Sequence, residues 1–246
     1  MNLILLSDPD FLTPTRVRLT GRRLLHIQDI LKAQCGQSLT VGKMNGLMGQ
    51  GTVVSKNTDC LELEVKLDRQ PPEALTLTLI LALPRPPMLK RILFSAAMLG
   101  VKKIIILNFN RVEKSLWNSS SLKPQAITEQ LVLGLEQAKD TVMPEVILKK
   151  GFKPFVQDEL PALIKGKTAL VAHPDKKSPL FNTKRGLGGV GSDYQEKPIT
   201  LIIGPEGGIL DYEIELLKTA GCQTLDLGPR ILRTETVLPY VIGKLF

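Results

Sequence analysis

Two short loops rich in glycine and proline carry the side chains best suited to chemistry. In the first loop, Gly204-Pro205-Glu206-Gly207-Gly208 directly follows an apolar run at 199–203. Because glycine lacks a β-carbon, backbone amides in such a loop can approach a ligand closely. An ordinary tight turn before a helix capped by Asp211 would also explain the glycines. A carboxylate between proline and two glycines is a poor turn filler, so Glu206 favours a ligand site beyond the end of a strand.

The second loop, Gly228-Pro229-Arg230, follows an apolar run at 224–227 and precedes a helix expected from residue 233. Free backbone amides and the helix dipole favour negative charge near the start of that helix. Arg230 and Arg233 flank the turn, and two guanidinium groups could hold a ligand carboxylate or an RNA phosphate. A solvated, charged turn is the alternative for this loop taken alone. Two such loops at the ends of predicted neighbouring strands favour one shared ligand site.

The loops need strands that end at one edge of a sheet, and the sequence from residue 75 onward predicts such a sheet. Apolar runs predict strands at 75–83, 104–107, 146–149, 169–172, 199–203 and 224–227. Helical spacing predicts helices at 87–99, 124–139, 154–164, 211–220 and 233–245. Strands that alternate with helices indicate an α/β fold, in which helices cover both faces of a parallel sheet.

The residues before this region predict a different, smaller domain. Short strands bounded by turn residues are expected at 3–6, 16–19, 38–44, 51–55 and 61–67, with one helix at 22–32. Five strands with one helix suggest a small β-barrel. Pro71 and Pro72 hold the following segment extended and predict a linker. We therefore expect one domain at 1–70 and a second at 74–246.

Composition narrows the class of protein. Lys and Arg number 32 against 24 Asp and Glu, and the net charge of +8 favours a polyanionic partner, although many basic proteins bind no nucleic acid. The three cysteines, Cys35, Cys60 and Cys222, are widely spaced, so we expect neither a zinc site nor disulfides, and we expect a cytoplasmic protein. No apolar stretch approaches the roughly 18 residues that a membrane span needs.

A third glycine-rich segment, Gly186-Leu187-Gly188-Gly189-Val190-Gly191, matches the pattern of a dinucleotide-binding turn. That interpretation needs a strand before the glycines and a helix after them, and neither is predicted here. We expect a polar surface loop over 174–198 instead. This segment is therefore the only support for the alternative that the chain is a nicotinamide oxidoreductase.

The two C-terminal loops, with the flanking Ile231-Leu232-Arg233-Thr234-Glu235-Thr236, resemble the RsmE family. Its members are uridine-N3 methyltransferases of 16S ribosomal RNA in the SPOUT superfamily. The resemblance implies a PUA-like, RNA-binding β-barrel at 1–70 and an α/β domain with a C-terminal trefoil knot at 74–246. It also implies S-adenosylmethionine as cofactor, a homodimer that completes the active site, and the small ribosomal subunit as partner.

The resemblance also implies the cofactor-binding residues. They come from three segments of the C-terminal domain: Leu170, Val171 and Ala172; Ile203, Gly204, Pro205, Glu206, Gly207 and Gly208; and Leu227, Gly228, Arg230, Ile231, Leu232 and Thr236. The chain departs from the family pattern at Met98, where a glutamate is usual, and in the segments 83–87 and 111–115. These departures bear on RNA docking and on the exact target more than on cofactor binding.

Methylation of uridine N3 sets clear chemical requirements. The N3 proton must leave, and the resulting anion spreads charge onto the neighbouring carbonyl oxygens. Glu206 or Glu235 could accept the proton, while Arg230 and Arg233 could stabilise the anion. The sulfonium already activates the methyl group, so no metal is expected. The arginines of the N-terminal domain that we expect to contact RNA are Arg16, Arg18, Arg22 and Arg23.

Two alternatives keep the same fold. A related SPOUT enzyme could methylate a ribose 2′-hydroxyl instead of a base. The chain could also be an RNA-binding ribosome assembly factor without catalytic activity, although both loops are intact.

Overall fold

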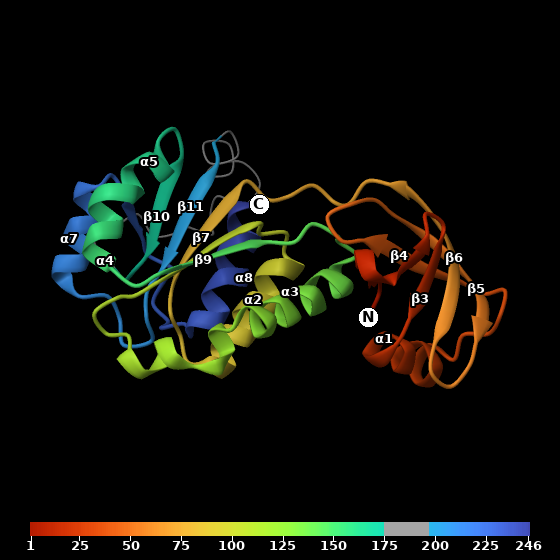
Figure 1. Cartoon of the computed structure of the whole chain (residues 1–246). Helices are drawn as coiled ribbons and strands as arrows, with labels where there is room; N and C mark the ends of the chain where they lie inside the picture. The colour runs from red at the N-terminus through yellow and green to blue at the C-terminus, as the bar shows by residue number, and fades with distance from the viewer. Residues whose placement is uncertain (175–196) are drawn as a thin grey trace. The chain divides into compact units, whose positions relative to one another are not determined.

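The chain is described by a computed structural model that covers residues 1–174 and 197–246. These residues form two compact units (Figure 1). The first unit comprises residues 1–73 and 131–143, and the second comprises 74–130 and 144–246. The glycine run at 186–191, and most of the loop predicted at 174–198, lie outside the described residues.

The first unit is built on one six-stranded sheet in the order β1-β4-β5-β6-β3-β2. Its strands are β1 (Ile4–Leu6), β2 (Phe11–Thr13), β3 (Arg16–Leu19), β4 (Ser38–Lys43), β5 (Met48–Lys56) and β6 (Leu61–Arg69). β1 pairs with β4 in parallel, and the other pairs are antiparallel. The alternation along β6 places Leu61, Leu63 and Val65 in the core, as the sequence predicts. The sequence misses β2, whose three residues are too few to show a period.

The helix of the first unit differs from the one predicted at 22–32. It consists of α1 (Gly21–Leu25) followed by a π-helical segment, η2 (His26–Leu31). Leu24 and Ile27 are buried, but Leu25, Ile30 and Leu31 are exposed, although the pattern predicts all five on one buried side. A π-turn adds a residue to each turn, so the apolar positions no longer form a single stripe.

The segment 131–143 joins the first unit through hydrogen bonds and an ion pair. It contains the C-terminal half of α3 (Pro124–Ala138), so this helix begins in one unit and ends in the other. The backbone N–H groups of Asn2 and Leu3 both donate to the Glu136 carbonyl at 3.0 Å. The buried Glu136 side chain pairs with Arg22 at 2.8 Å. The division of the chain into two units therefore does not follow a single cut in the sequence.

The second unit contains a six-stranded sheet in the order β12-β10-β11-β7-β8-β9. The strands are β7 (Leu77–Ala82), β8 (Lys103–Leu107), β9 (Glu145–Lys149), β10 (Thr168–Ala172), β11 (Ile199–Ile203) and β12 (Gln223–Leu225). Every pair is parallel, so the prediction of a parallel α/β sheet is confirmed. β7 and β11 are buried along their whole length, which explains their unbroken apolar sequences.

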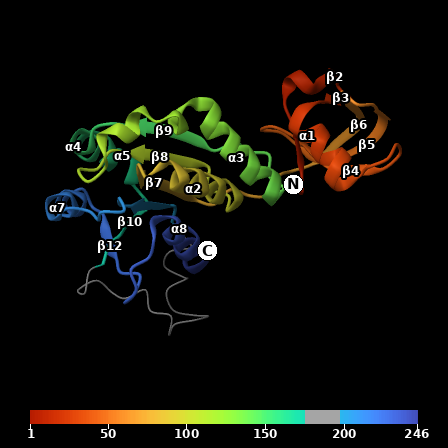
Figure 2. The ribbon, with the colours of Figure 1, turned by 90° about the horizontal axis from the view of Figure 1, so that it is seen from below.

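Helices cover both faces of this sheet (Figure 2). They are α2 (Pro86–Met98), the start of α3, α4 (Phe152–Pro154), η5 (Phe155–Glu159), α5 (Leu160–Ile164), α7 (Asp211–Thr219) and α8 (Thr234–Leu245), with short 3-10 turns η3 (Lys114–Asn118) and η4 (Ser120–Leu122). α2 and α8 pack together on one face, and α4, α5 and α7 lie on the other. The helix predicted at 154–164 is divided, because η5 is π-helical between α4 and α5.

A buried carboxylate fixes the start of the first unit. Asp10, in the 3-10 turn η1 (Asp8–Asp10), accepts hydrogen bonds from the Ser7 backbone and hydroxyl at 2.6 and 2.7 Å. Arg23 donates to both Asp10 oxygens at 2.6 Å and to the Leu5 carbonyl at 2.8 Å. Burial pushes the pKa of the Asp10 carboxyl upward, but the hydrogen bonds from Arg23 and Ser7 outweigh it and hold that pKa below its usual value.

We expect Asp10→Asn to lower the free energy of unfolding at pH 7 by about 2 kcal/mol, because it leaves Arg23 with a poorer partner. A carboxyl with a lowered pKa stabilises the fold above its unfolded-state pKa. The difference from wild type should therefore shrink as the pH falls below about 4. Urea unfolding across this pH range measures it. Asp8→Asn is the control, since the Asp8 side chain is 84% exposed and should change little. Equal unfolding curves for wild type and Asp10→Asn at pH 7 would contradict this role.

Candidate functional site

Three parallel strands bring the predicted cofactor segments to one edge of the sheet. β10 lies between β11 and β12, and its last residue, Ala172, pairs with Ile203 on one side and Leu225 on the other. All three strands therefore end at the same level of the sheet. The sequence predicts neighbouring strands for the two glycine-proline loops, and this detail is wrong because β10 separates them. Leu170 and Val171 are buried, so Ala172 is the only one of the three predicted β10 residues with a partly exposed side chain at this edge.

The loop after β11 is a tight turn with an exposed tip. The Gly208 N–H donates to the Pro205 carbonyl at 2.8 Å, and Gly208 has a φ of +81° that few other residues adopt. A β-carbon on Gly204 would clash with Cγ1 of Ile209, so any other residue at the end of this strand would have to displace the Ile209 side chain. Glu206 and Gly207 are exposed at the tip of the turn. Gly204 thus permits the close approach of Ile209, Gly208 permits the turn, and the Glu206 side chain is exposed to solvent.

Charged side chains from two other strand ends contact this loop. Arg85, just after β7, lies with its Nε 3.7 Å from Glu206 Oε2 and its Nη2 3.2 Å from Glu113 Oε1. Arg111, after β8, donates from Nη1 to the Gly207 carbonyl. Arg85, Arg111 and Glu113 lie in the two segments that depart from the family pattern, at 83–87 and 111–115. Sequence reasoning did not assign them to the site, because no local spacing indicates that β7, β8 and β11 end side by side.

A buried glutamate ties the same loop to the segment after β8. Glu213, in the first turn of α7, is 0% exposed. Its Oε1 accepts the Asn110 N–H at 2.8 Å and its Oε2 accepts the Leu210 N–H at 3.0 Å. α7 begins after Leu210, so Asp211 is the first helical residue and does not cap the helix as the turn interpretation supposed. A glutamate three residues after the N-cap is a known capping position, and this signal could have identified Glu213.

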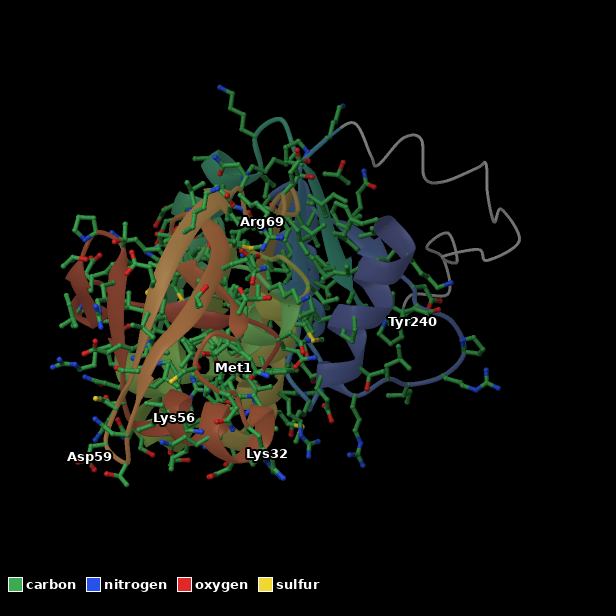
Figure 3. The ribbon with its side chains drawn as sticks, turned by 90° about the vertical axis from the view of Figure 1, so that its right-hand side faces the viewer. Met1, Lys32, Lys56, Asp59, Arg69 and Tyr240 are labelled. Atoms are coloured by element: carbon green, nitrogen blue, oxygen red, sulfur yellow. The ribbon has the colours of Figure 1, made fainter. Side chains whose placement is uncertain are left out.

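The loop after β12 leads into α8 with Arg230 and Arg233 exposed. Gly228, with a φ of +107°, donates to Asp226 Oδ1 at 3.0 Å. The Tyr240 hydroxyl, on α8 and labelled in Figure 3, donates to the Leu227 carbonyl at 3.3 Å. Arg230, Arg233, Thr236 and Ile231 are exposed, and the Ile231 side chain is 96% exposed. Arg233 is the N-cap of α8, and its carbonyl accepts the N–H groups of residues 236 and 237.

The structure separates the two candidate proton acceptors. Glu206 lies beside Arg85, whereas Glu235 lies 3.9 Å from Arg91 Nη1. Glu235 also lines a hollow of about 340 Å³. The six residues that line the hollow come from α2, α3 and α8: Lys90, Arg91, Phe94, Ser95, Gln130 and Glu235. The site therefore has two acidic positions with different surroundings, one on the turn after β11 and one at the start of α8.

The four arginines expected to contact RNA each have a carboxylate partner in the first unit. Arg16 and Arg18 on β3 both pair with Glu62 at 2.8 Å, and their side chains are 40% and 51% exposed. Alternate residues of a strand share a face, so these two guanidinium groups lie side by side. Their charge is partly balanced by Glu62, but both remain accessible.

Arg22 and Arg23 pair with carboxylates that are buried in the first unit. Arg22 pairs with the buried Glu136, and Arg23 makes the buried contacts with Asp10 that fix the start of the unit. The four arginines are therefore not one uniform cluster.

Within the described residues, no group of three or more His, Cys, Asp or Glu side chains could hold a metal ion. Among the same residues, no helix has both the length and the apolar character needed to cross a membrane.

Comparisons with known proteins agree on one family. A family model described as the RNA methyltransferase domain matches residues 71–245. A relative from Treponema pallidum, ribosomal RNA small subunit methyltransferase E, is 26% identical over 239 residues, which are 96% of this chain and 87% of the relative.

Solved structures share the fold. A methyltransferase from Legionella pneumophila, solved with S-adenosylmethionine, matches with a TM-score of 0.74 and 24% identity, over 100% of this chain and 97% of that chain. A ribosomal RNA small subunit methyltransferase E from Neisseria gonorrhoeae, also solved with S-adenosylmethionine, gives 0.73 and 21%, over 99% and 95%. At these identities the likeness establishes the α/β fold.

The close approach at Gly204 gives a stability prediction. We expect Gly204→Ala to lower the free energy of unfolding by about 1–3 kcal/mol, because its methyl group would displace Ile209. Gly243→Ala in α8 is the matched control: a β-carbon there meets nothing within 4 Å, and alanine should stabilise the helix slightly. Chemical denaturation of both variants measures the difference. If Gly204→Ala unfolds at the same denaturant concentration as Gly243→Ala, the loop is not closely packed.

Proposed function

The chain belongs to the RNA methyltransferase family, and we propose that it transfers a methyl group from S-adenosylmethionine to N3 of a uridine. This uridine lies in 16S ribosomal RNA of the small ribosomal subunit. The observation that carries this proposal is that the neighbouring strands β12, β10 and β11 end in register at one edge of the sheet. The Treponema pallidum relative, whose name specifies small-subunit ribosomal RNA, supports the substrate class.

The residues at this edge suit a methyl donor that carries an adenosine and an amino acid. The turn after β11 exposes backbone at Gly207 and Gly208 that no β-carbon shields, and the loop after β12 offers the apolar Leu227, Ile231 and Leu232. Arg230 and Arg233 suit the carboxylate of the donor's methionine part or an RNA phosphate. Ala172 and Ile203 end the adjoining strands, and Thr236 follows in the first turn of α8. When bound, the donor supplies an activated methyl group on sulfur.

The remaining steps fall to side chains of the chain. Uridine N3 must lose its proton to a carboxylate, and Glu206 and Glu235 are the two candidates. Arg85 at 3.7 Å orients Glu206, and Arg91 at 3.9 Å orients Glu235. Arg233 or Arg230 stabilises the charge that spreads to the carbonyl oxygens. The bond from N3 to the methyl carbon forms as the bond from that carbon to sulfur breaks.

The proposal extends to the finer architecture. The first unit is a PUA-like barrel that contacts ribosomal RNA, with Arg16 and Arg18 as its exposed contacts and Arg22 and Arg23 as further contacts. The second unit is a SPOUT domain with a C-terminal trefoil knot, and two copies of the chain complete the active site in a cytoplasmic homodimer. The accessible guanidinium groups on β3 and the net charge of +8 support an RNA partner.

Nucleoside analysis tests the reaction and its position. Purified protein, labelled S-adenosylmethionine and either undermethylated small ribosomal subunits or naked 16S RNA are incubated, and the RNA is digested and separated. We expect label in N3-methyluridine. Label in a 2′-O-methylated nucleoside would overturn the base specificity and favour the ribose methyltransferase. Absence of label with both substrates would favour an assembly factor without activity.

Arg233→Ala is the matched inactive variant for this assay. It should lower the rate by about 100-fold or more. Loss of one group that stabilises developing charge commonly raises the activation free energy by about 2.7–4 kcal/mol, which slows the reaction by roughly 100- to 1000-fold. Lys218→Ala, which removes an exposed cation on α7, should keep full activity. Circular dichroism and sedimentation should be unchanged in both variants. Full activity of Arg233→Ala would remove this residue from the mechanism.

A further inference from the structure

None of the residues that line the hollow beside Glu235 is among those proposed to bind the methyl donor. α2 contributes Lys90 and Phe94, which are one helical turn apart, and Arg91 and Ser95, which are the next such pair. Gln130 comes from α3 and Glu235 from the first turn of α8. The volume of about 340 Å³ lies at the lower end of the range for small-ligand sites.

The side chains that line the hollow suit one nucleotide of single-stranded RNA. Phe94 is half-buried, so its ring is held in place and partly accessible, which suits stacking of a base. The Gln130 amide offers both a donor and an acceptor to the edge of a base. Lys90 and Arg91 put two cations on one wall, and Glu235 engages Arg91 at 3.9 Å. Lys90 is therefore the better placed of the two for a backbone phosphate.

The position of the hollow relates it to the reacting nucleotide. Glu235 follows Arg233 and Thr234 directly, so the hollow adjoins the loop after β12. An RNA strand that delivered its uridine to that loop would bring an adjacent nucleotide within reach of the hollow. The target uridine itself fits less well, because hydrogen bonds from Gln130 would occupy the base edge that must accept the methyl group.

We propose that this hollow binds the nucleotide adjacent to the target uridine, with its base on Phe94, its edge at Gln130 and its phosphate at Lys90. The inference rests on the proposed function and adds a subsite that reads the sequence around the target. It makes Phe94, Gln130 and Lys90 determinants of RNA affinity and not of the chemical step.

The central test is Phe94→Leu, which keeps apolar volume but removes the aromatic face. Binding of a fluorescent single-stranded oligouridylate should weaken about tenfold. In turnover with small subunits, KM should rise by a similar factor while kcat stays near the wild-type value. Tyr212→Leu removes an exposed aromatic ring on α7 that does not line the hollow, and it should match wild type.

Lys90→Gln tests the phosphate contact separately. The slope of log Kd for the oligouridylate against log salt concentration should become smaller by about 0.7, the value for one phosphate contact to a single strand. An unchanged slope would remove Lys90 from the subsite.

Three outcomes of the Phe94→Leu experiment would overturn the inference. Unchanged oligouridylate affinity would mean that no base stacks there. Weakened binding of S-adenosylmethionine would assign the hollow to the methyl donor, and a changed sedimentation coefficient would assign it to a second copy of the chain. Failure of the wild-type protein to methylate RNA would refute the proposed function, yet a selective loss of oligouridylate binding in Phe94→Leu would still establish a nucleotide site.

Discussion

Parallel pairing of β12, β10 and β11 is the constraint on which the site depends. Because Ala172 is in register with Ile203 on one side and Leu225 on the other, three segments distant in sequence leave the sheet at one level. The loops after β11 and β12 then expose glycine backbone and the start of α8 at this edge. A different strand order would scatter these segments, and neither loop alone has more than the features of a tight turn.

Contacts from the other half of the sheet hold the first of these loops. Glu213 accepts two backbone N–H groups, one from Leu210 and one from Asn110, and is fully buried. Arg111 bonds to the Gly207 carbonyl, and Arg85 lies between Glu206 and Glu113. A buried carboxylate is tolerated only when its hydrogen bonds are satisfied, so Glu213 links the loop to β8 rather than leaving it to move independently.

Sequence reasoning predicted the local features of this molecule well and the long-range ones poorly. Unbroken apolar runs identified the four central strands of the parallel sheet, β10, β11, β7 and β8, because burial on both faces leaves a clear pattern. The position of β10 between β11 and β12 was missed, since no local period encodes strand order. The exposed Leu25 and Ile30 were misjudged because a π-helical segment shifts the apolar stripe. The paired Arg22 and Arg23 were treated like Arg16 and Arg18, because Glu136 and Asp10 become their partners only in the folded chain.

Calorimetric titration of S-adenosylmethionine, and of its demethylated product, into the folded wild-type protein tests the account most directly. It asks whether the edge at which β10, β11 and β12 end is a methyl-donor site. We expect saturable heat with both compounds, because the proposed contacts of the loop backbone, Arg230 and Arg233 are to the adenosine and amino-acid parts, which the two compounds share. If a protein with native circular dichroism gives no heat of binding with either compound, the loops at this edge do not bind a methyl donor.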